Sequence, residues 1–94
     1  MSNDEDGLWI TCRRHGRGRC AVVCTHHLEV RTHPVGFVDN SPAPDDLQAW
    51  CHACEKLFVA EGKMTAAFLA FNHARIVCIK CFDLLRQRHS VASA

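Results

Sequence analysis

The stretch Trp50-Cys51-His52-Ala53-Cys54, together with Cys78-Ile79-Lys80-Cys81, decides the fold of this chain. Thiolates at Cys-x-x-Cys spacing can bind one tetrahedral zinc ion from a tight turn, and two such turns supply four ligands. The stretch between the pairs, residues 55–77, is slightly longer than the roughly 15–20-residue spacer that is usual for this motif. We therefore expect one zinc ion at an all-cysteine site, with the ligands Cys51, Cys54, Cys78 and Cys81.

The first of these pairs also has an interpretation without metal. From Leu47 to Phe58 the apolar residues recur at steps of three and four, which predicts a helix that is capped by Asp45 or Asp46 and ends near Gly62. Two cysteines three residues apart would share the buried face of that helix. This alternative leaves the matching second pair unexplained, and sulfurs at i and i+3 point the same way, so helix and zinc ligation are compatible.

Two further short Cys/His pairs precede this region, Cys12-x-x-His15 and Cys24-x-His26. Residues 8–12 and 20–24 favour β-strands, and the Gly- and Arg-rich connection between them predicts a hairpin that would bring Cys12 near Cys24. A second zinc ion held by Cys12, His15, Cys24 and His26 is the corresponding hypothesis. In the alternative, Cys24 is a small core residue and the histidines face solvent. Cys20 has no partner at ligand spacing and is left out.

The remaining chain predicts alternating short elements. Residues 28–32 alternate like a half-buried strand, 33–36 form a turn, 37–39 return as its partner strand, and 40–46 form a loop. Thr65 caps a helix over residues 66–73, with Met64, Phe68 and Phe71 as a core stripe. Residues 75–77 are extended, and a last helix over 81–88 points Phe82 and Leu85 inward.

The fold class that follows is a small zinc-stabilised α+β domain, with N-terminal β-hairpins followed by two to three helices. A Cys-x-x-Cys turn that runs into the last helix predicts a treble-clef-like C-terminal half. The 94 residues suit one domain over 8–89, with an acidic, mobile lead-in over 1–7 and a frayed end over 90–94. A chain this short often needs a metal or disulfides for stability.

Composition restricts the location and the partners. The acidic start lacks the features of a signal peptide, and no apolar run reaches the roughly 20 residues of a membrane helix, so we expect a cytoplasmic protein without a membrane partner. The odd number of cysteines, seven, and a reducing compartment both favour metal or redox chemistry over disulfides. The net charge of +1 gives no overall attraction to nucleic acid, and no small-molecule substrate is indicated.

One local basic segment stands out from this neutral total. Arg13, Arg14, Arg17 and Arg19 lie within the expected hairpin loop and could contact an anion or the phosphates of nucleic acid. In the alternative, the loop is simply solvated or is balanced by the acidic residues 4–6 of the same chain.

The ordered pattern as a whole resembles a group of small bacterial Cys/His-rich zinc-binding proteins. The residues that carry this resemblance are Cys12-x-x-His15-Gly16, Val23-Cys24-x-His26, Trp50-Cys51-x-x-Cys54-Glu55 and Cys78-x-x-Cys81. It covers about Leu8 to Arg88 and implies that all eight residues could be ligands, but it implies no activity. A looser similarity to the ubiquitin-binding zinc-finger domain lacks that family's closing histidines and tail pocket, so ubiquitin binding is not inferred.

The function expected from these features is that of a non-catalytic zinc module acting as a protein-interaction or adaptor domain. No phosphate loop, His-Glu-x-x-His motif or nucleophile elbow is present in the sequence. The alternatives are a nucleic-acid-binding module that uses the basic loop, and a redox- or metal-responsive thiol switch. A deaminase-like zinc enzyme is a further alternative, since His27-Leu28-Glu29 precedes Cys51-x-x-Cys54 as that motif requires. Against it, Trp50 stands where the motif needs proline.

Overall fold

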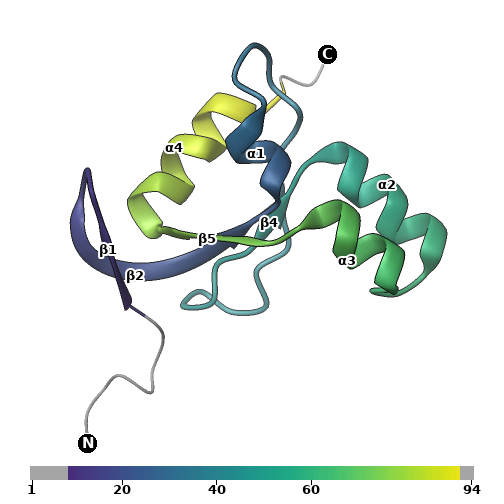
Figure 1. The fold of residues 1–94 in the computed structure, drawn as a ribbon, viewed down its shortest axis with the longest axis horizontal. Coiled ribbons are helices and arrows are strands. Elements are labelled where there is room, and N and C mark those ends of the chain that lie inside the picture. The colour runs from purple at the N-terminus through teal and green to yellow at the C-terminus, as the bar shows by residue number, and fades with distance from the viewer. Residues whose placement is uncertain (1–8, 92–94) are drawn as a thin grey trace, which may run out of the picture.

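A computed structural model describes residues 9–91, which form five short strands and four helices. The predicted acidic lead-in and most of the predicted frayed end lie outside these residues. Figure 1 shows the strand-rich N-terminal half packed under α4, with the helical pair α2 and α3 extending to one side. This confirms the expected α+β class. Among the described helices, none has the length and apolar character that crossing a bilayer would require.

The N-terminal hairpin consists of β1 (Trp9–Cys12) and β2 (Gly16–Val23). Its register pairs Cys12 with Gly16, so only residues 13–15 form the turn, and the predicted long loop is wrong. Gly16 makes this tight turn feasible because it adopts a positive φ of 76°. The register also corrects the expectation that the hairpin brings Cys12 near Cys24, because Cys24 follows the far end of β2.

The long strand β2 is the central strand of the three-stranded sheet, whose order is β1-β2-β5. Its first half pairs with β1, and its second half pairs antiparallel with β5 (Arg75–Cys78), which places Val23 opposite Arg75 and Cys20 opposite Cys78. At about 3.3 Å per residue, the eight residues of β2 give a strand length of roughly 23 Å along its curved path (Figure 1). The two halves of β2 therefore pair with different strands.

A short helix, α1 (Thr25–Glu29), occupies part of the region where a strand over 28–32 was predicted. Apolar and polar residues do alternate over 28–32, as in a strand. The first of them nevertheless belong to a helical turn, in which the Val30 N–H donates to the His26 carbonyl. The partner strand expected at 37–39 is present as β3 (Val38–Asp39), although it pairs with β4 (Ala49–Trp50).

The helix α2 (His52–Glu61) begins later than the sequence pattern predicts. The preceding residues belong to β4, and the Val22 N–H donates to the Leu47 carbonyl, so this segment lies against β2. Cys51, and neither aspartate, caps α2, and Gly62 ends it as predicted with a φ of 77°. Tertiary strand pairing thus overrides the local helical periodicity.

The last elements agree more closely with the sequence. Thr65 caps α3 (Ala66–Asn72) by accepting the Phe68 N–H, and β5 leads into α4 (Ile79–His89). Phe82 and Leu85 point inward, as predicted. Of the expected core stripe only Phe68 is buried, because Met64 and Phe71 remain 52% and 41% exposed.

Two apolar clusters form the interior. The first lies between the sheet and α4 and contains Ala21, Val23, Ala49, Val77, Phe82 and Leu85. The second lies beneath α2 and α3 and contains Trp50, Phe68, Cys24, Cys51 and Cys54. Three of the candidate metal ligands are thus part of the second core.

Candidate metal centres

Eight Cys and His side chains converge in two groups of four. Site 1 contains Cys12, His15, Cys78 and Cys81, and site 2 contains Cys24, His26, Cys51 and Cys54. In each group the four ligand atoms lie within 4.8 Å of one another. All eight residues singled out from the sequence are brought into clusters, and Cys20 belongs to neither group.

The structure groups these residues differently from the expectation. The four cysteines of the two Cys-x-x-Cys pairs do not come together, so the predicted all-cysteine site is wrong in its grouping, as is the site of Cys12, His15, Cys24 and His26. Each Cys-x-x-Cys pair instead joins one of the N-terminal Cys/His pairs. Both groups therefore have three sulfurs and one imidazole nitrogen.

The register of β2 explains this crossed arrangement. The turn with Cys12 and His15 precedes β2, whereas Cys24 and His26 follow its other end. The strand β5 runs antiparallel to the second half of β2 and ends with Cys78 opposite Cys20, next to the half of β2 that pairs with β1. The segment before α2 contacts Val22 and delivers Cys51 to the second end. The two groups therefore lie at different positions along β2.

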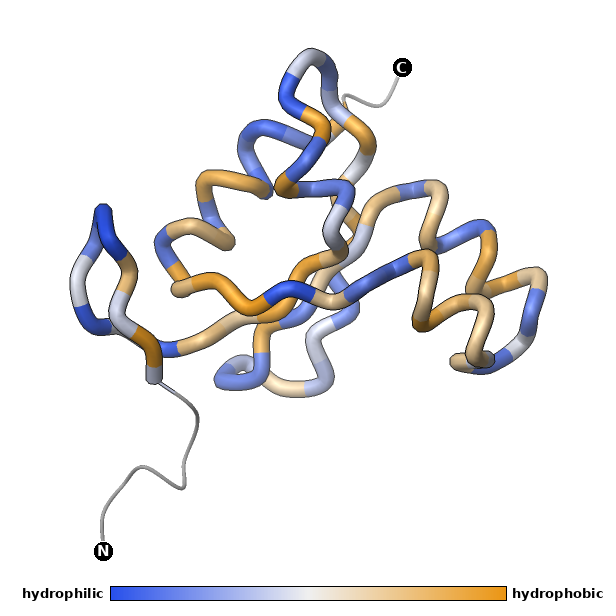
Figure 2. Tube along the Cα trace, viewed as in Figure 1, coloured by the Kyte–Doolittle hydropathy of each residue, from blue (hydrophilic) through white to orange (hydrophobic). Residues whose placement is uncertain are grey.

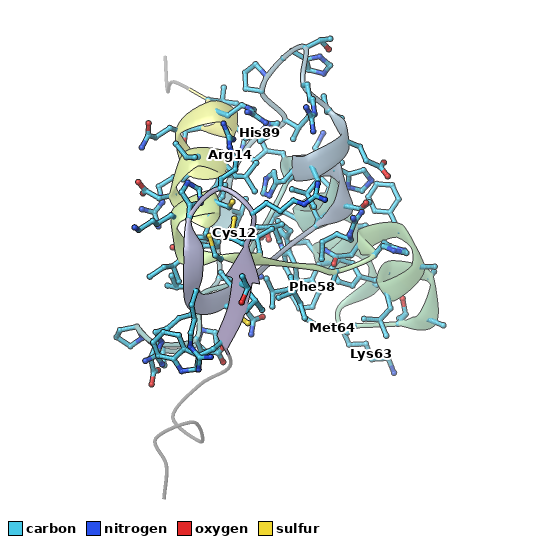
Figure 3. All side chains as sticks on the ribbon, turned by 60° about the vertical axis from the view of Figure 1, so that its left-hand side comes forward. Cys12, Arg14, Phe58, Lys63, Met64 and His89 are labelled. Carbon is cyan, nitrogen blue, oxygen red and sulfur yellow. The ribbon has the colours of Figure 1, made fainter. Side chains whose placement is uncertain are left out.

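Site 1 combines a hairpin turn with a helix N-terminus. The His15 Nδ1 atom lies 3.5 Å from the Cys12 sulfur, 3.3 Å from that of Cys78 and 3.5 Å from that of Cys81. The Cys12 and Cys81 sulfurs are 3.7 Å apart, far beyond the length of about 2.05 Å of a disulfide. Figure 3 shows the sulfur atoms gathered beside Cys12.

These distances match the edges of a zinc tetrahedron. Zinc bonds of about 2.3 Å to sulfur and about 2.05 Å to nitrogen, at tetrahedral angles, place two sulfurs about 3.8 Å apart and sulfur and nitrogen about 3.5 Å apart. In site 2, the His26 Nδ1 atom lies 3.5 Å from the sulfurs of both Cys51 and Cys54. The donor set and spacing of both sites therefore suit zinc.

Backbone amides support the thiolates. In site 1, the N–H groups of Arg14 and then His15 lower the pKa of the Cys12 thiol to about 6. Cys78 and Cys51 cap α4 and α2, and their sulfurs accept the N–H groups of Cys81 at 3.4 Å and Cys54 at 3.5 Å. Helix N-termini favour negative charge at these positions.

Crowding among the thiols has the opposite effect. Burial, followed by the neighbouring thiols of Cys12 and Cys78, raises the pKa of Cys81 to about 12. In site 2, hydrogen bonds with Cys24 and Cys54 lower the pKa of Cys51, while the thiols of Cys24 and Cys51 raise the pKa of Cys54. Three thiolates this close repel one another, so a divalent cation is needed to hold them all ionised.

Sequence reasoning missed two supporting side chains of site 2. The Asn72 amide is buried at the end of α3 and donates to the Cys54 sulfur at 3.5 Å. The Phe71 ring contacts the His26 ring with a centroid distance of 4.5 Å. Asn72 is the only polar residue of the helix Ala66–Asn72, and a lone polar residue on an apolar helix is a signal that could have indicated a buried partner.

The Trp50-Cys51-x-x-Cys54-Glu55 motif has a structural explanation. The Trp50 indole N–H donates to the Glu55 carboxylate at 2.7 Å, which joins the residues on either side of the ligand pair. The indole ring also packs against Phe68 and Phe58 at 4.9 and 5.2 Å between centroids. This clamp holds the turn that presents Cys51 and Cys54.

The residues of the deaminase-like hypothesis are not assembled. His27 is buried, its Nε2 atom donates to the Gly36 carbonyl at 2.8 Å, and its ring stacks on Phe37 and His89. Glu29 accepts the Thr25 hydroxyl at 3.2 Å. Neither residue belongs to the group that contains Cys51 and Cys54.

The four arginines of the basic segment separate into two places. Arg13 and Arg14 are exposed in the hairpin turn, whereas Arg17 and Arg19 lie on β2, with guanidinium groups 5.1 and 5.9 Å from the centroid of the Trp9 ring. Arg19 also lies 4.0 Å from the Asp45 carboxylate.

Comparison of the chain with protein-family models, with curated proteins and with solved structures gave no significant match. The resemblance to small bacterial Cys/His-rich proteins and the treble-clef likeness therefore stay predictions from the residue pattern. What the structure establishes is the geometry: two groups of three cysteines and one histidine whose ligand atoms lie close enough together to hold a metal ion.

Proposed function

We propose that this protein is a non-catalytic zinc-binding module that acts as a protein-interaction or adaptor domain. The observation that carries the proposal is the composition of the two clusters, each of which supplies four protein ligands. A tetrahedral zinc ion with four protein ligands has no open position for water or substrate, which is the hallmark of a structural site. The metals then contribute directly to folding free energy.

An exposed apolar surface on the α2–α3 pair supports a protein partner. Its large side chains are Val59, Met64, Leu69 and Phe71, which are between 41% and 67% exposed. The helix Ala66–Asn72 contains no charged residue at all, and Figure 2 shows hydrophobic colouring along it. Contiguous apolar surface is characteristic of interaction sites. Phe58 and Met64, which are labelled in Figure 3, also line one groove together with residues of β3 and β4.

Metal content and coordination test the first part of the proposal. We expect native mass spectrometry to find two zinc ions per chain, and a strong chelator to unfold the protein as seen by circular dichroism. In the cobalt-substituted protein, the visible absorption should report tetrahedral coordination and stay unchanged when cyanide is added. A spectrum that shifts with cyanide would reveal an open coordination position and contradict a purely structural role.

Matched surface variants test the second part. Partners are first defined as proteins that the wild-type chain captures and that cross-link to α3. Leu69→Lys on α3 should abolish association with these partners and leave the zinc content unchanged. Ile76→Lys on β5 is the control, because Ile76 is 58% exposed but lies outside the α2–α3 surface. Equal association by both variants would contradict an α2–α3 interface.

A second candidate function is binding of single-stranded nucleic acid by the hairpin. It is favoured by Trp9, which is 42% exposed beside Arg17 and Arg19, because bases stack on such aromatic rings while cations contact phosphates. Replacement of Arg13, Arg14, Arg17 and Arg19 by Gln should leave folding intact and remove oligonucleotide binding in a fluorescence anisotropy titration. Binding that survives this change would exclude the basic hairpin as the contact surface.

A further inference from the structure

A cavity of about 210 Å³ lies between the hairpin turn, the segment after α1, β5 and α4. Residues from distant parts of the chain form it, since Arg14 comes from the turn, Arg31 follows α1, and Arg88 lies in the last turn of α4. Figure 3 shows Arg14 beside α4. The cavity is separate from the Trp9 surface and from the apolar α2–α3 surface.

The floor of this cavity is apolar. Val77 and Leu85 are buried members of the first core cluster, and Leu28 packs against that cluster from α1. These side chains belong to elements with extensive packing, so the floor is preformed. An apolar group of a ligand would lose contact with water there, at a gain of about 25 cal/mol per Å² buried.

The rim of the cavity is cationic, without an acidic residue among those that the structure describes. Within residues 9–91, none of the three arginines makes an ion pair. Among residues 9–91, the acidic residues nearest in sequence to Arg31 and Arg88 have other partners, because Glu29 accepts the Thr25 hydroxyl and Asp83 accepts Arg86 and Gln87. Three arginines thus line a 210 Å³ space together with apolar residues.

We propose that this cavity binds a phosphate monoester carried on an apolar group, as presented by a phosphorylated side chain of a protein partner. The dianion offers three acceptor oxygens, which guanidinium forks bind with charge-assisted hydrogen bonds. The apolar floor distinguishes such a ligand from a free inorganic ion. This inference rests on the proposed role as a protein-interaction module and names the chemistry of the partner.

The cavity is physically joined to metal site 1. Arg14 lies between the ligands Cys12 and His15, so a metal ion that holds this turn also holds Arg14 over the cavity. Cys81 is both a member of site 1 and a lining residue. Binding of the phosphate monoester should therefore depend on metal at site 1, and the ligand should in turn slow metal loss from it.

The test is a calorimetric titration of the full-length zinc-loaded protein with phenyl phosphate, with zinc content measured on the same sample. Loss of one charge-assisted contact should weaken binding about tenfold in each of Arg14→Gln, Arg31→Gln and Arg88→Gln. Arg13→Gln is the matched control, because Arg13 is also exposed in the same turn but does not line the cavity. It should bind as the wild type does.

Phenol and inorganic phosphate test the two halves of the ligand, and each should bind at least about tenfold more weakly than phenyl phosphate. Equal weakening by Arg13→Gln and Arg14→Gln, or inorganic phosphate binding as well as phenyl phosphate, would overturn the proposal. Displacement of phenyl phosphate by a single-stranded oligonucleotide at lower concentration would assign the cavity to nucleic acid instead. A folded protein with two zinc ions that ignores phenyl phosphate refutes this inference alone, whereas absence of zinc refutes the proposed function.

Discussion

Gly36 has both a backbone conformation that favours glycine and a side chain packed directly against it. Its φ is 92°, its N–H donates to the His89 carbonyl, and a Cβ atom here would clash with the His52 ring. Gly62 has a similar φ of 77° but open space around it. The two glycines therefore separate the cost of the backbone conformation from the cost of the steric contact.

We predict that Gly62→Ala lowers the free energy of unfolding by about 1 kcal/mol, and Gly36→Ala by about 2–3 kcal/mol. Urea denaturation at saturating zinc measures both. The double variant Gly36→Ala/His52→Ala should recover most of the difference, since it removes the clashing ring. Equal effects of the two single variants would show that His52 rotates away without cost.

His89 predicts a pH dependence. It is fully buried, donates through Nε2 to the His27 carbonyl at 2.9 Å and accepts the Val35 N–H at 3.3 Å. Burial lowers the pKa of His89, so below about pH 6.5, the pKa of a histidine in an unfolded chain, the unfolded state binds the extra proton and stability falls.

The His89→Gln variant should therefore lose less stability than the wild type between pH 7.5 and pH 5.5, by up to about 1 kcal/mol. Urea midpoints at fixed zinc concentration measure this, because protonation of the metal ligands then affects both proteins alike. His33→Gln, at an exposed position, is the control. An unchanged pH profile for His89→Gln would contradict the role of the buried imidazole.

At the scale of elements, α3 acts as a support for metal site 2. Its last turn carries Asn72 against the Cys54 sulfur and Phe71 against the His26 ring. Its first turn depends on Thr65, which accepts the Phe68 N–H at 3.1 Å and donates to Glu61. A weaker N-cap should therefore loosen site 2 before it affects site 1.

We predict that Thr65→Ala costs about 1 kcal/mol of stability and speeds metal loss from one of the two sites in a competition assay with a chromophoric chelator. Thr65→Ser retains the hydroxyl group and should behave as the wild type. Asn72→Ala should speed loss from the same site. Faster loss from both sites together would indicate global destabilisation instead.

At the scale of the whole molecule, the crossed grouping of the ligands has a decisive test. In the observed arrangement Cys12 and Cys24 belong to different sites, whereas Cys24 and Cys54 share one. Cys12→Ser/Cys24→Ser should therefore impair both sites, and Cys24→Ser/Cys54→Ser should leave one zinc ion bound at site 1. Native mass spectrometry of the two double variants measures this. If Cys12→Ser/Cys24→Ser still bound one full equivalent of zinc, the crossed grouping would be contradicted and the hypothesis of an all-cysteine site would be supported.

Local chemistry in the sequence was sufficient for much of this protein. Ligand residue types at short spacing identified all eight members of the clusters, because each Cys-x-x-Cys, Cys-x-x-His or Cys-x-His pair is made within one turn of chain. Elements with their own end signals were also predictable, such as α3 with its Thr65 cap and the Gly62 end of α2. The α+β class followed from these elements and their order.

Only the tertiary structure decided how the pairs combine. Residue spacing cannot distinguish sequential from crossed pairing, because either grouping satisfies zinc with four ligands. The choice was made by the register of β2, because its first half pairs with the strand that carries Cys12, Cys78 lies opposite Cys20, and the segment before Cys51 contacts Val22 near the strand end that leads to Cys24. The same pairing moved the N-cap of α2 to Cys51 and brought Arg14, Arg31 and Arg88 to one cavity. Long-range strand pairing has no signature in the local sequence, and here it outweighs local propensity.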